Sequence, residues 1–146
     1  MTLLIQNVAG QNVYDLVYAD YLSGLPIIDQ ETMHRAMRNS AYTWLCTDDD
    51  SHIVCIWGLI APTLLSDQAY LWMYTTKYLE EHIFLFIRHS QRALEQALEL
   101  YPIICGHCVI NNTKAIRWLR WLGAKFGDPH GHVLPFEIKA KQWPQV

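Results

Sequence analysis

The sequence lacks the features that mark membrane, disordered and collagen-like proteins. Of its 146 residues only 7 are glycine and 6 are proline, and 17% are charged. The longest charge-free stretch of its apolar middle region, 51–66, contains Pro62 and is too short to cross a bilayer as a helix. Because no Lys or Arg precedes Arg35, we expect no basic targeting peptide, no membrane partner and a cytoplasmic location.

Cysteine is also scarce. The four cysteines are too few for a disulfide scaffold, and a chain of this length buries roughly 70% of the surface it exposes when unfolded, so it does not need one. We expect them to be reduced and mostly buried. They are Cys46, Cys55, Cys105 and Cys108.

Positive charge is sparse and unevenly placed. The formal net charge is -3, with seven acidic and two basic residues in 1–50 and two acidic and six basic residues in 114–146. The basic end is adequate for one phosphorylated small molecule but falls short of the dense Lys/Arg face of nucleic-acid-binding proteins. We therefore expect no nucleic-acid partner.

Motifs of hydrolases, nucleotide-binding loops and dinucleotide folds are absent, and two Cys/His patterns remain. The CxxC formed by Cys105 and Cys108 lies inside an apolar β run, where residues three apart point to opposite faces about 10 Å apart, so a redox role is disfavoured. Zinc would need partners such as His130 and His132, which fit a solvated turn better. We predict no metal site, with Asp48–Asp50 serving as turn residues.

The chain shows no internal repeat and no linker, which predicts a single domain over 1–146. Its periodicities and turn residues predict an α/β fold. The expected elements are a possible strand at 2–8, helices at 12–22 and 29–39, strands at 42–46, 52–60 and 69–76, a long helix at 78–100, a strand buried on both faces at 103–110, a helix at 112–123, and β segments at 124–127 and 133–139.

The helix at 112–123 has the clearest limits. Asn112 is its predicted cap and Gly123 its stop. Trp118 belongs to its core face, whereas Trp121, three positions later, is expected to be partly exposed.

This same region carries a family resemblance. The segment VINNTKAIRWLRWLGAKF (109–126) resembles the strand-to-helix motif of the GNAT family of N-acetyltransferases. The matching residues are Asn112, Ala115, Leu122 and Gly123, while Phe126 comes two residues later than the family's aromatic residue. The order of elements is also similar over nearly the whole chain. The resemblance implies a GNAT-like fold, with a twisted, mixed, mostly antiparallel sheet and helices on both faces.

The resemblance implies acetyl-CoA as cofactor and an amine as substrate, in a direct acyl transfer. Backbone groups of Met73, Tyr74 and Thr75 would pair with the pantetheine, and Asn112 with Ala115 would lie at the cofactor arm. His107 is the candidate catalytic acid or base if it faces the cleft; otherwise it is a core histidine.

Two departures from the family pattern keep a second function open. The segment TTKYLEEHIF (75–84) has no glycine, and it carries Glu80 and Glu81 where the family binds a diphosphate, with Lys77 or Arg88 as partial compensation. Leu119 replaces the tyrosine that protonates the departing thiolate, although a thiol with a pKa of about 8.5 leaves without much help.

The second function comes from a narrower resemblance. The segments 56–76, 86–102 and 115–123 are similar to GNAT-like proteins of tailed bacteriophages that are related to an internal virion protein. This narrower resemblance implies a catalytically degenerate protein that acts in virion assembly or on a host protein, with oligomer formation possible. Its candidate contact residues are Trp121, Arg117 and Arg120.

Overall fold

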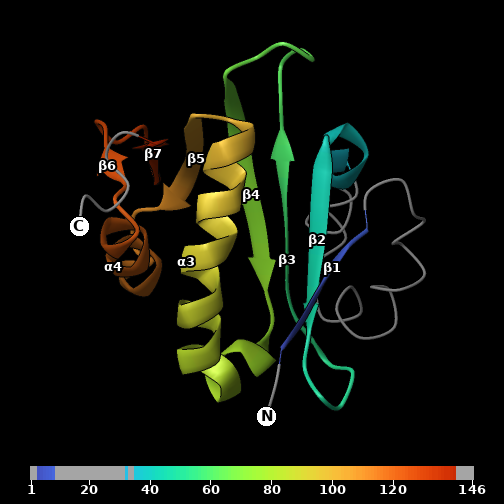
Figure 1. Cartoon of the computed structure of the whole chain (residues 1–146). Coiled ribbons are helices and arrows are strands. Elements are labelled where there is room, and N and C mark those ends of the chain that lie inside the picture. The colour runs from blue at the N-terminus through green and yellow to red at the C-terminus, as the bar shows by residue number, and fades with distance from the viewer. Residues whose placement is uncertain (1–2, 9–31, 33–34, 141–146) are drawn as a thin grey trace. The chain divides into compact units, whose positions relative to one another are not determined.

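The computed structural model describes residues 3–8, 32 and 35–140 (Figure 1). In order, the elements of this part of the chain are β1 (Leu4–Asn7), β2 (Tyr42–Thr47), β3 (Ile53–Ile60), β4 (Gln68–Thr75), the 3₁₀ helix η2 (Lys77–His82), α3 (Ile83–Leu100), β5 (Ile103–Val109), α4 (Thr113–Trp121), β6 (Lys125–Phe126) and β7 (Val133–Lys139). Strands predominate up to β4, and helices and strands alternate from α3 to β6.

The seven strands form one sheet in the order β1-β2-β3-β4-β5-β7-β6. Four neighbouring pairs are antiparallel, namely β1 with β2, β2 with β3, β5 with β7, and β6 with β7. Strands β4 and β5 are parallel, as expected for strands joined by a helical crossover, here η2 and α3. The predicted α/β class with a mixed, mostly antiparallel sheet is confirmed.

Contacts within the chain divide it into two compact units. The first comprises Met1–Ile60 and Trp72–Phe86, and the second Ala61–Leu71 and Ile87–Val146. A single domain over 1–146 and helices on both faces of the sheet stay predictions. The helix expected at 12–22 lies outside the described residues.

The β2–β3 hairpin forms the core of the first unit. Strand β3 is buried along almost its whole length, as its continuous apolar sequence predicts for a central strand. In the turn, Asp48 accepts hydrogen bonds from the backbone N–H groups of Asp50 (3.0 Å) and His52 (2.9 Å), while Ser51 adopts a φ of 65°. The predicted turn role of the aspartates is therefore confirmed for Asp48.

A glycine in β3 makes room for a tryptophan of β4. A Cβ atom on Gly58 would lie 2.6 Å from the indole of Trp72. The Trp72 indole N–H donates a 2.6 Å hydrogen bond to Ser40 Oγ, and the Ser40 hydroxyl donates to the carbonyl of Ala36. Of the helix expected at 29–39, the structure describes residue 32 and residues 35–39 as helical.

Strand β5, in the second unit, is buried on one face only, which corrects the expectation of a strand buried on both. Ile104, Gly106 and Cys108 point inward, whereas His107 and Val109 are exposed on the other face. The periodicity of the sequence could not predict which face is exposed, because both faces of β5 carry residue types that are common in protein cores. Gly106 faces the ring of Phe136, which would lie 2.6 Å from a Cβ at this position.

Helix α4 follows the predicted limits closely. The side chain of Asn112 caps it and Gly123 ends it with a φ of 98°. Its Trp118 is half-buried, and the indole N–H of Trp118 donates a 3.1 Å hydrogen bond to Ser90 Oγ on α3. Trp121 is 54% exposed, as expected.

The long helix begins later than the sequence predicts. Residues 77–82 form a 3₁₀ helix, and regular α-helix starts only at Ile83. Here Leu79 N–H bonds the carbonyl of Thr76, three residues back, which is the 3₁₀ pattern, and the side chain of Thr76 caps the same turn. Across the part of the chain that the structure describes, no helix is both long and apolar enough to span a membrane.

Candidate acyl-transfer site

The last residues of β4 are the predicted contacts of a pantetheine arm. The parallel ladder with β5 joins Gln68–Tyr70 to Ile103–Cys105, so Met73, Tyr74 and Thr75 lie beyond its last pair. Met73 and Tyr74 are half-buried and Thr75 is exposed. A strand end outside a ladder is where backbone groups can pair with an extended ligand.

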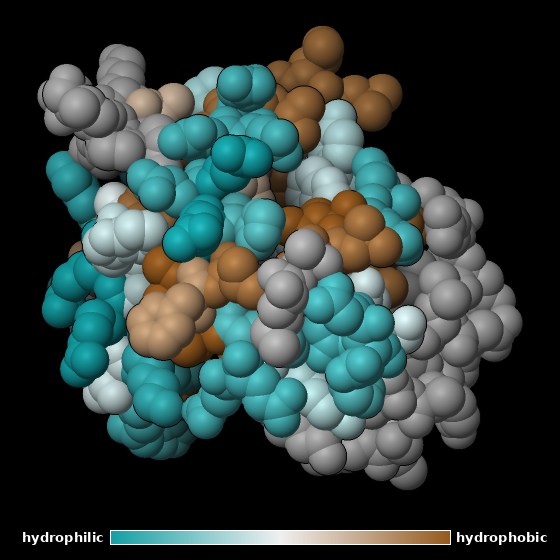
Figure 2. All heavy atoms as spheres, turned by 60° about the horizontal axis from the view of Figure 1, so that its bottom comes forward, coloured by the Kyte–Doolittle hydropathy of each residue, from teal (hydrophilic) through white to brown (hydrophobic). Residues whose placement is uncertain are grey.

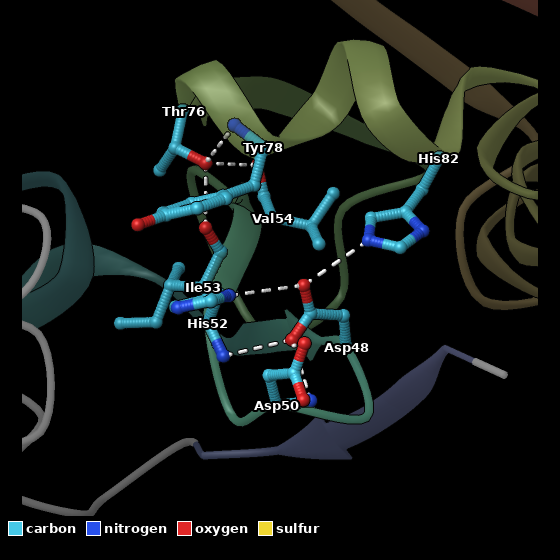
Figure 3. Close-up of polar contacts among 8 residues, drawn as sticks. All are labelled: Asp48, Asp50, His52, Ile53, Val54, Thr76, Tyr78 and His82. Carbon is cyan, nitrogen blue, oxygen red and sulfur yellow. Dashed lines mark hydrogen bonds and ion pairs between the residues drawn. The ribbon is translucent and has the colours of Figure 1, made fainter. Parts of the chain in front are cut away.

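Thr76 ties the end of β4 to β3. Its N–H donates to the carbonyl of Val54 (3.0 Å), and its hydroxyl donates to the carbonyl of Ile53 (Figure 3). The hydroxyl oxygen also accepts the N–H of Tyr78 (3.2 Å), and the Thr76 carbonyl accepts the N–H of Leu79 (3.1 Å). Three donors around the start of η2, the amides of residues 76, 78 and 79, are thus engaged within the chain.

Two side chains of η2 contact the β2–β3 turn (Figure 3). The buried carboxylate of Asp48 lies 3.1 Å from Nε2 of His82 and 3.4 Å from Nδ1 of His52. The ring of Tyr78 stacks on that of His52, with centroids 4.0 Å apart and planes 3° from parallel. Together with Thr76, these pairs fasten η2 to the hairpin.

The pKa of Asp48 lies below its ordinary value. Burial opposes this shift and is the largest single influence, but it is outweighed by hydrogen bonds from the His52 amide, the His82 ring and the Asp50 amide. Asp48 therefore stays ionised as an acceptor.

The same turn brings three possible metal ligands together. Oxygen or nitrogen atoms of Asp48, Asp50 and His52 lie within 4.8 Å of one another. However, Asp48 already accepts two backbone amides and faces two imidazoles, an arrangement that a turn explains without an ion. His130 and His132 are both exposed, in a turn closed by hydrogen bonds between His130 and Val133.

Negative charge predominates around η2. Glu80 and Glu81 are exposed on η2 itself, and Asp48–Asp50 belong to the turn that η2 contacts. Arg88 is exposed on α3, one of the two cations expected to compensate; the side chain of the other, Lys77, lies outside the described residues.

In the second unit, His107 is exposed and hydrogen-bonded rather than part of the core. Its Nδ1 lies 3.3 Å from the hydroxyl of Tyr70, and the two ring centroids are 5.6 Å apart. Burial, with a smaller contribution from Cys105, raises the pKa of Tyr70, which keeps the phenol protonated at neutral pH. The contact lies at the end of the β4–β5 ladder, because Tyr70 is the last paired residue of β4.

Asn112 and Ala115 are brought together at the start of α4. The Asn112 side-chain oxygen accepts the N–H of Ala115 at 3.1 Å, which confirms the predicted cap. Leu119, which replaces the tyrosine of the family pattern, is only 4% exposed and belongs to the core. These residues and His107 belong to the second unit, whereas Met73–Thr75 belong to the first.

The CxxC cysteines have the properties of structural thiols. All four cysteines are free, and Cys105 and Cys108 occupy opposite faces of β5, as predicted. Burial raises the pKa of both thiols, with Glu137 adding to the effect at Cys105. Raised pKa values lower the thiolate fraction on which redox chemistry depends.

Sequence reasoning missed three participants in these sites: Tyr70, Thr76 and the Asp48–His82 pair. For Thr76 a signal existed, since a threonine directly before a helical segment is a common cap. The partners of Tyr70 and of His82 lie 37 and 34 residues away in the chain, and no local pattern predicts such contacts.

No family model and no curated protein matches the chain. Solved structures do. Spermidine N-acetyltransferase of Vibrio cholerae in complex with CoA and spermine has a TM-score of 0.65 at 14% identity, covering 96% of each chain. The N-acetyltransferase PseH of Campylobacter jejuni with acetyl coenzyme A has a TM-score of 0.64 at 14% identity, covering 94% of this chain and 99% of PseH.

A putative phosphinothricin N-acetyltransferase gives a TM-score of 0.68 at 10% identity, covering 94% of this chain and 98% of its own. Two of these neighbours are N-acetyltransferases and the third is named as a putative one, and each match covers at least 94% of this chain. The chain has the GNAT fold. At these identities the likeness establishes the fold alone.

Proposed function

We propose that this GNAT-fold chain transfers an acetyl group from a thioester to an amine. The observation that carries the proposal is the His107–Tyr70 contact, an exposed imidazole held by a phenol at the end of the β4–β5 ladder. Met73, Tyr74 and Thr75 follow directly in β4 and supply backbone groups for the thioester arm. An exposed acid–base group of this kind suits direct attack by an amine.

Acetyl-CoA is the donor that the fold implies, and it would supply the activated acetyl thioester. The end of β4 fits its pantetheine arm. The contact of Asn112 and Ala115 with the cofactor arm stays what the resemblance implies, and in the structure these two residues form the cap of α4. The η2 segment does not fit its diphosphate, because the nearby amides are engaged and the side chains are acidic. The chemistry is therefore derived for the thioester and not for the nucleotide.

The proposed step needs one proton acceptor and one donor. The amine nitrogen attacks the thioester carbonyl carbon, the C–S bond breaks, and an amide and a thiol are formed. His107 takes a proton from the amine through Nε2 and returns it to the sulfur. Backbone N–H groups of 73–75 polarise the thioester carbonyl.

A second function is favoured by the surface of α4. Trp121 is 54% exposed, Arg117 and Arg120 are exposed on the same helix, and the Arg120 guanidinium lies 5.6 Å from the ring centre of Phe126. Exposed tryptophan and arginine are typical of protein-binding surfaces. This surface would serve the virion or host-protein role implied by the phage resemblance, which rests on sequence alone.

The test of acyl transfer measures thiol release from acetyl-CoA and from acetylpantetheine with a panel of amines, including polyamines and amino sugars. We expect release with at least one amine, and we expect His107→Ala to lower kcat by about 100-fold, a typical contribution of a general acid–base group. His130→Ala, in an exposed turn, is the matched control. No release with any amine would overturn the proposal, and capture of a partner that depends on Trp121 would support the second function.

A further inference from the structure

The η2 segment is chemically unsuited to a diphosphate. Diphosphate sites need free backbone N–H groups, close backbone approach and positive charge. Residues 76–83 contain no glycine, and the amides of Thr76, Tyr78 and Leu79 already donate to Val54, Thr76 Oγ1 and the Thr76 carbonyl. To bind phosphate oxygens, these amides would have to leave their present partners.

The electrostatic field at this end of the first unit is also of the wrong sign. Glu80 and Glu81 are exposed on η2, and the turn that contacts η2 carries three more carboxylates at 48–50. Five acidic residues on the two segments outnumber the one lysine, Lys77. A diphosphate placed here would be repelled, most strongly at low ionic strength.

The segment is also held against rearrangement. The His82–Asp48 pair, the Tyr78–His52 stack and the two carbonyl contacts of Thr76 join η2 to the hairpin at separate points (Figure 3). Remodelling η2 into a phosphate-binding loop would break all of these contacts. One of them joins the buried carboxylate of Asp48 to a buried imidazole, and leaving a buried carboxylate without a hydrogen-bond partner is among the costlier changes in a protein.

We propose that the chain takes its acyl group from a pantetheine thioester without using a nucleotide diphosphate. The inference rests on the proposed function and concerns which part of the donor is recognised. The pantetheine arm is uncharged and is bound by the end of β4, whereas the nucleotide part of CoA gains nothing from η2. Acyl transfer itself is unchanged, with amine and thioester giving amide and thiol.

The test compares kcat/KM for acetyl-CoA, acetylpantetheine and an acetylated carrier protein, with the same amine. Two charge-assisted hydrogen bonds to a diphosphate would favour acetyl-CoA by about 100-fold. We expect the preference for acetyl-CoA over acetylpantetheine to stay below about tenfold, and a larger preference would overturn the inference. The acetylated carrier protein shows whether free or protein-bound pantetheine is the better donor. A higher kcat/KM with either of these donors than with acetyl-CoA supports the inference.

A charge variant sharpens the test. Glu80→Gln/Glu81→Gln removes two negative charges from η2, so we expect a lower KM for acetyl-CoA and an unchanged KM for acetylpantetheine. Glu95→Gln/Glu99→Gln on α3 makes the same charge change at least 12 residues along the helix, about 18 Å from its start, and is the matched control. An equal effect of both variants would contradict a local role for η2.

Binding measured by NMR separates this inference from the proposed function. Addition of CoA or pantetheine is expected to shift the amide resonances of Met73–Thr75 equally, and to leave those of Thr76, Tyr78 and Leu79 unmoved. This result without turnover would reject the acyl transfer and keep only the recognition of pantetheine without the diphosphate. Shifts at Thr76, Tyr78 and Leu79 with CoA alone would overturn the inference, and no shift with either ligand would overturn both.

Discussion

Asp48 shows how one side chain can join two segments of the first unit. Its Oδ1 accepts two amides of its own turn, and its Oδ2 faces the rings of His82 and His52. It is buried, with 3% of its side chain exposed. A buried carboxylate with this many partners is stabilising only while it is ionised.

Asp48→Asn is predicted to lower the free energy of unfolding at neutral pH by about 2 kcal/mol, because the amide NH₂ that replaces Oδ2 cannot accept a hydrogen bond. The pKa of Asp48 is depressed in the folded state, so its contribution is present above the ordinary value of 3.8 and is lost as the pH falls through the folded value. Urea unfolding at pH 7 and at pH 3 checks this. Wild type should lose more stability than the variant on acidification, and Asp128→Asn, at an exposed position outside the helices and strands, should behave like wild type.

Tyr70 is predicted to act through His107 as a positioning residue. The 3.3 Å contact between Nδ1 and the Tyr70 hydroxyl suits a neutral ring with its proton on Nδ1, which would donate to the Tyr70 oxygen and leave Nε2 to accept a proton from the amine. Tyr70→Phe should lower kcat about fivefold, the value of one hydrogen bond of about 1 kcal/mol, with KM unchanged. Nitrogen NMR of the His107 ring should show a different tautomer in Tyr70→Phe than in wild type. In a His107→Ala background, Tyr70→Phe should not lower kcat further. A full effect in that background would show a different role.

At the scale of elements, two glycines determine how aromatic residues pack on the sheet. Gly58 in β3 lies under the Trp72 indole, and Gly106 in β5 lies under the Phe136 ring. In both cases the missing Cβ leaves the space that the ring fills, so a glycine within a strand marks a packing site and not a weak point.

Gly58→Ala is predicted to lower the free energy of unfolding by about 1–3 kcal/mol, the usual cost of overpacking a core. The new methyl group would meet the indole at 2.6 Å and disturb its hydrogen bond to Ser40. A double-mutant cycle with Trp72→Phe checks the cause, since a smaller ring should recover part of the loss. Simple additivity of the two substitutions would contradict the proposed contact.

At the scale of the molecule, the four thiols are free and are spread over both units. Cys46 and Cys55 face each other across the hairpin and are 1% and 0% exposed. A hydrogen bond from Cys55 lowers the pKa of Cys46, while the same bond and burial raise the pKa of Cys55. Burial also raises the pKa values of Cys105 and Cys108.

Titration with a chromogenic disulfide is therefore predicted to be slow in the native protein, with the half-buried Cys105 reacting first. All four thiols should react rapidly in denaturant. Fast reaction of two native thiols followed by an internal disulfide would revive the redox interpretation of the CxxC motif.

The sequence by itself determined the order of the strands and long helices from β2 to β7, the hairpin turn at Asp48, the cap at Asn112 and the stop at Gly123. These features depend on residues close together in the chain, whose hydrogen bonds and backbone preferences act locally. It also indicated, through Glu80 and Glu81, that the segment after β4 is unsuited to a diphosphate.

Only the tertiary structure decided that His107 is exposed and bonded to Tyr70, that η2 replaces the first turns of the long helix, and that Asp48 holds His82. Each of these depends on partners more than 20 residues apart in the chain, which sheet register and packing bring together. Local periodicity carries no information about such partners, because it records which residues can be buried but not what they meet.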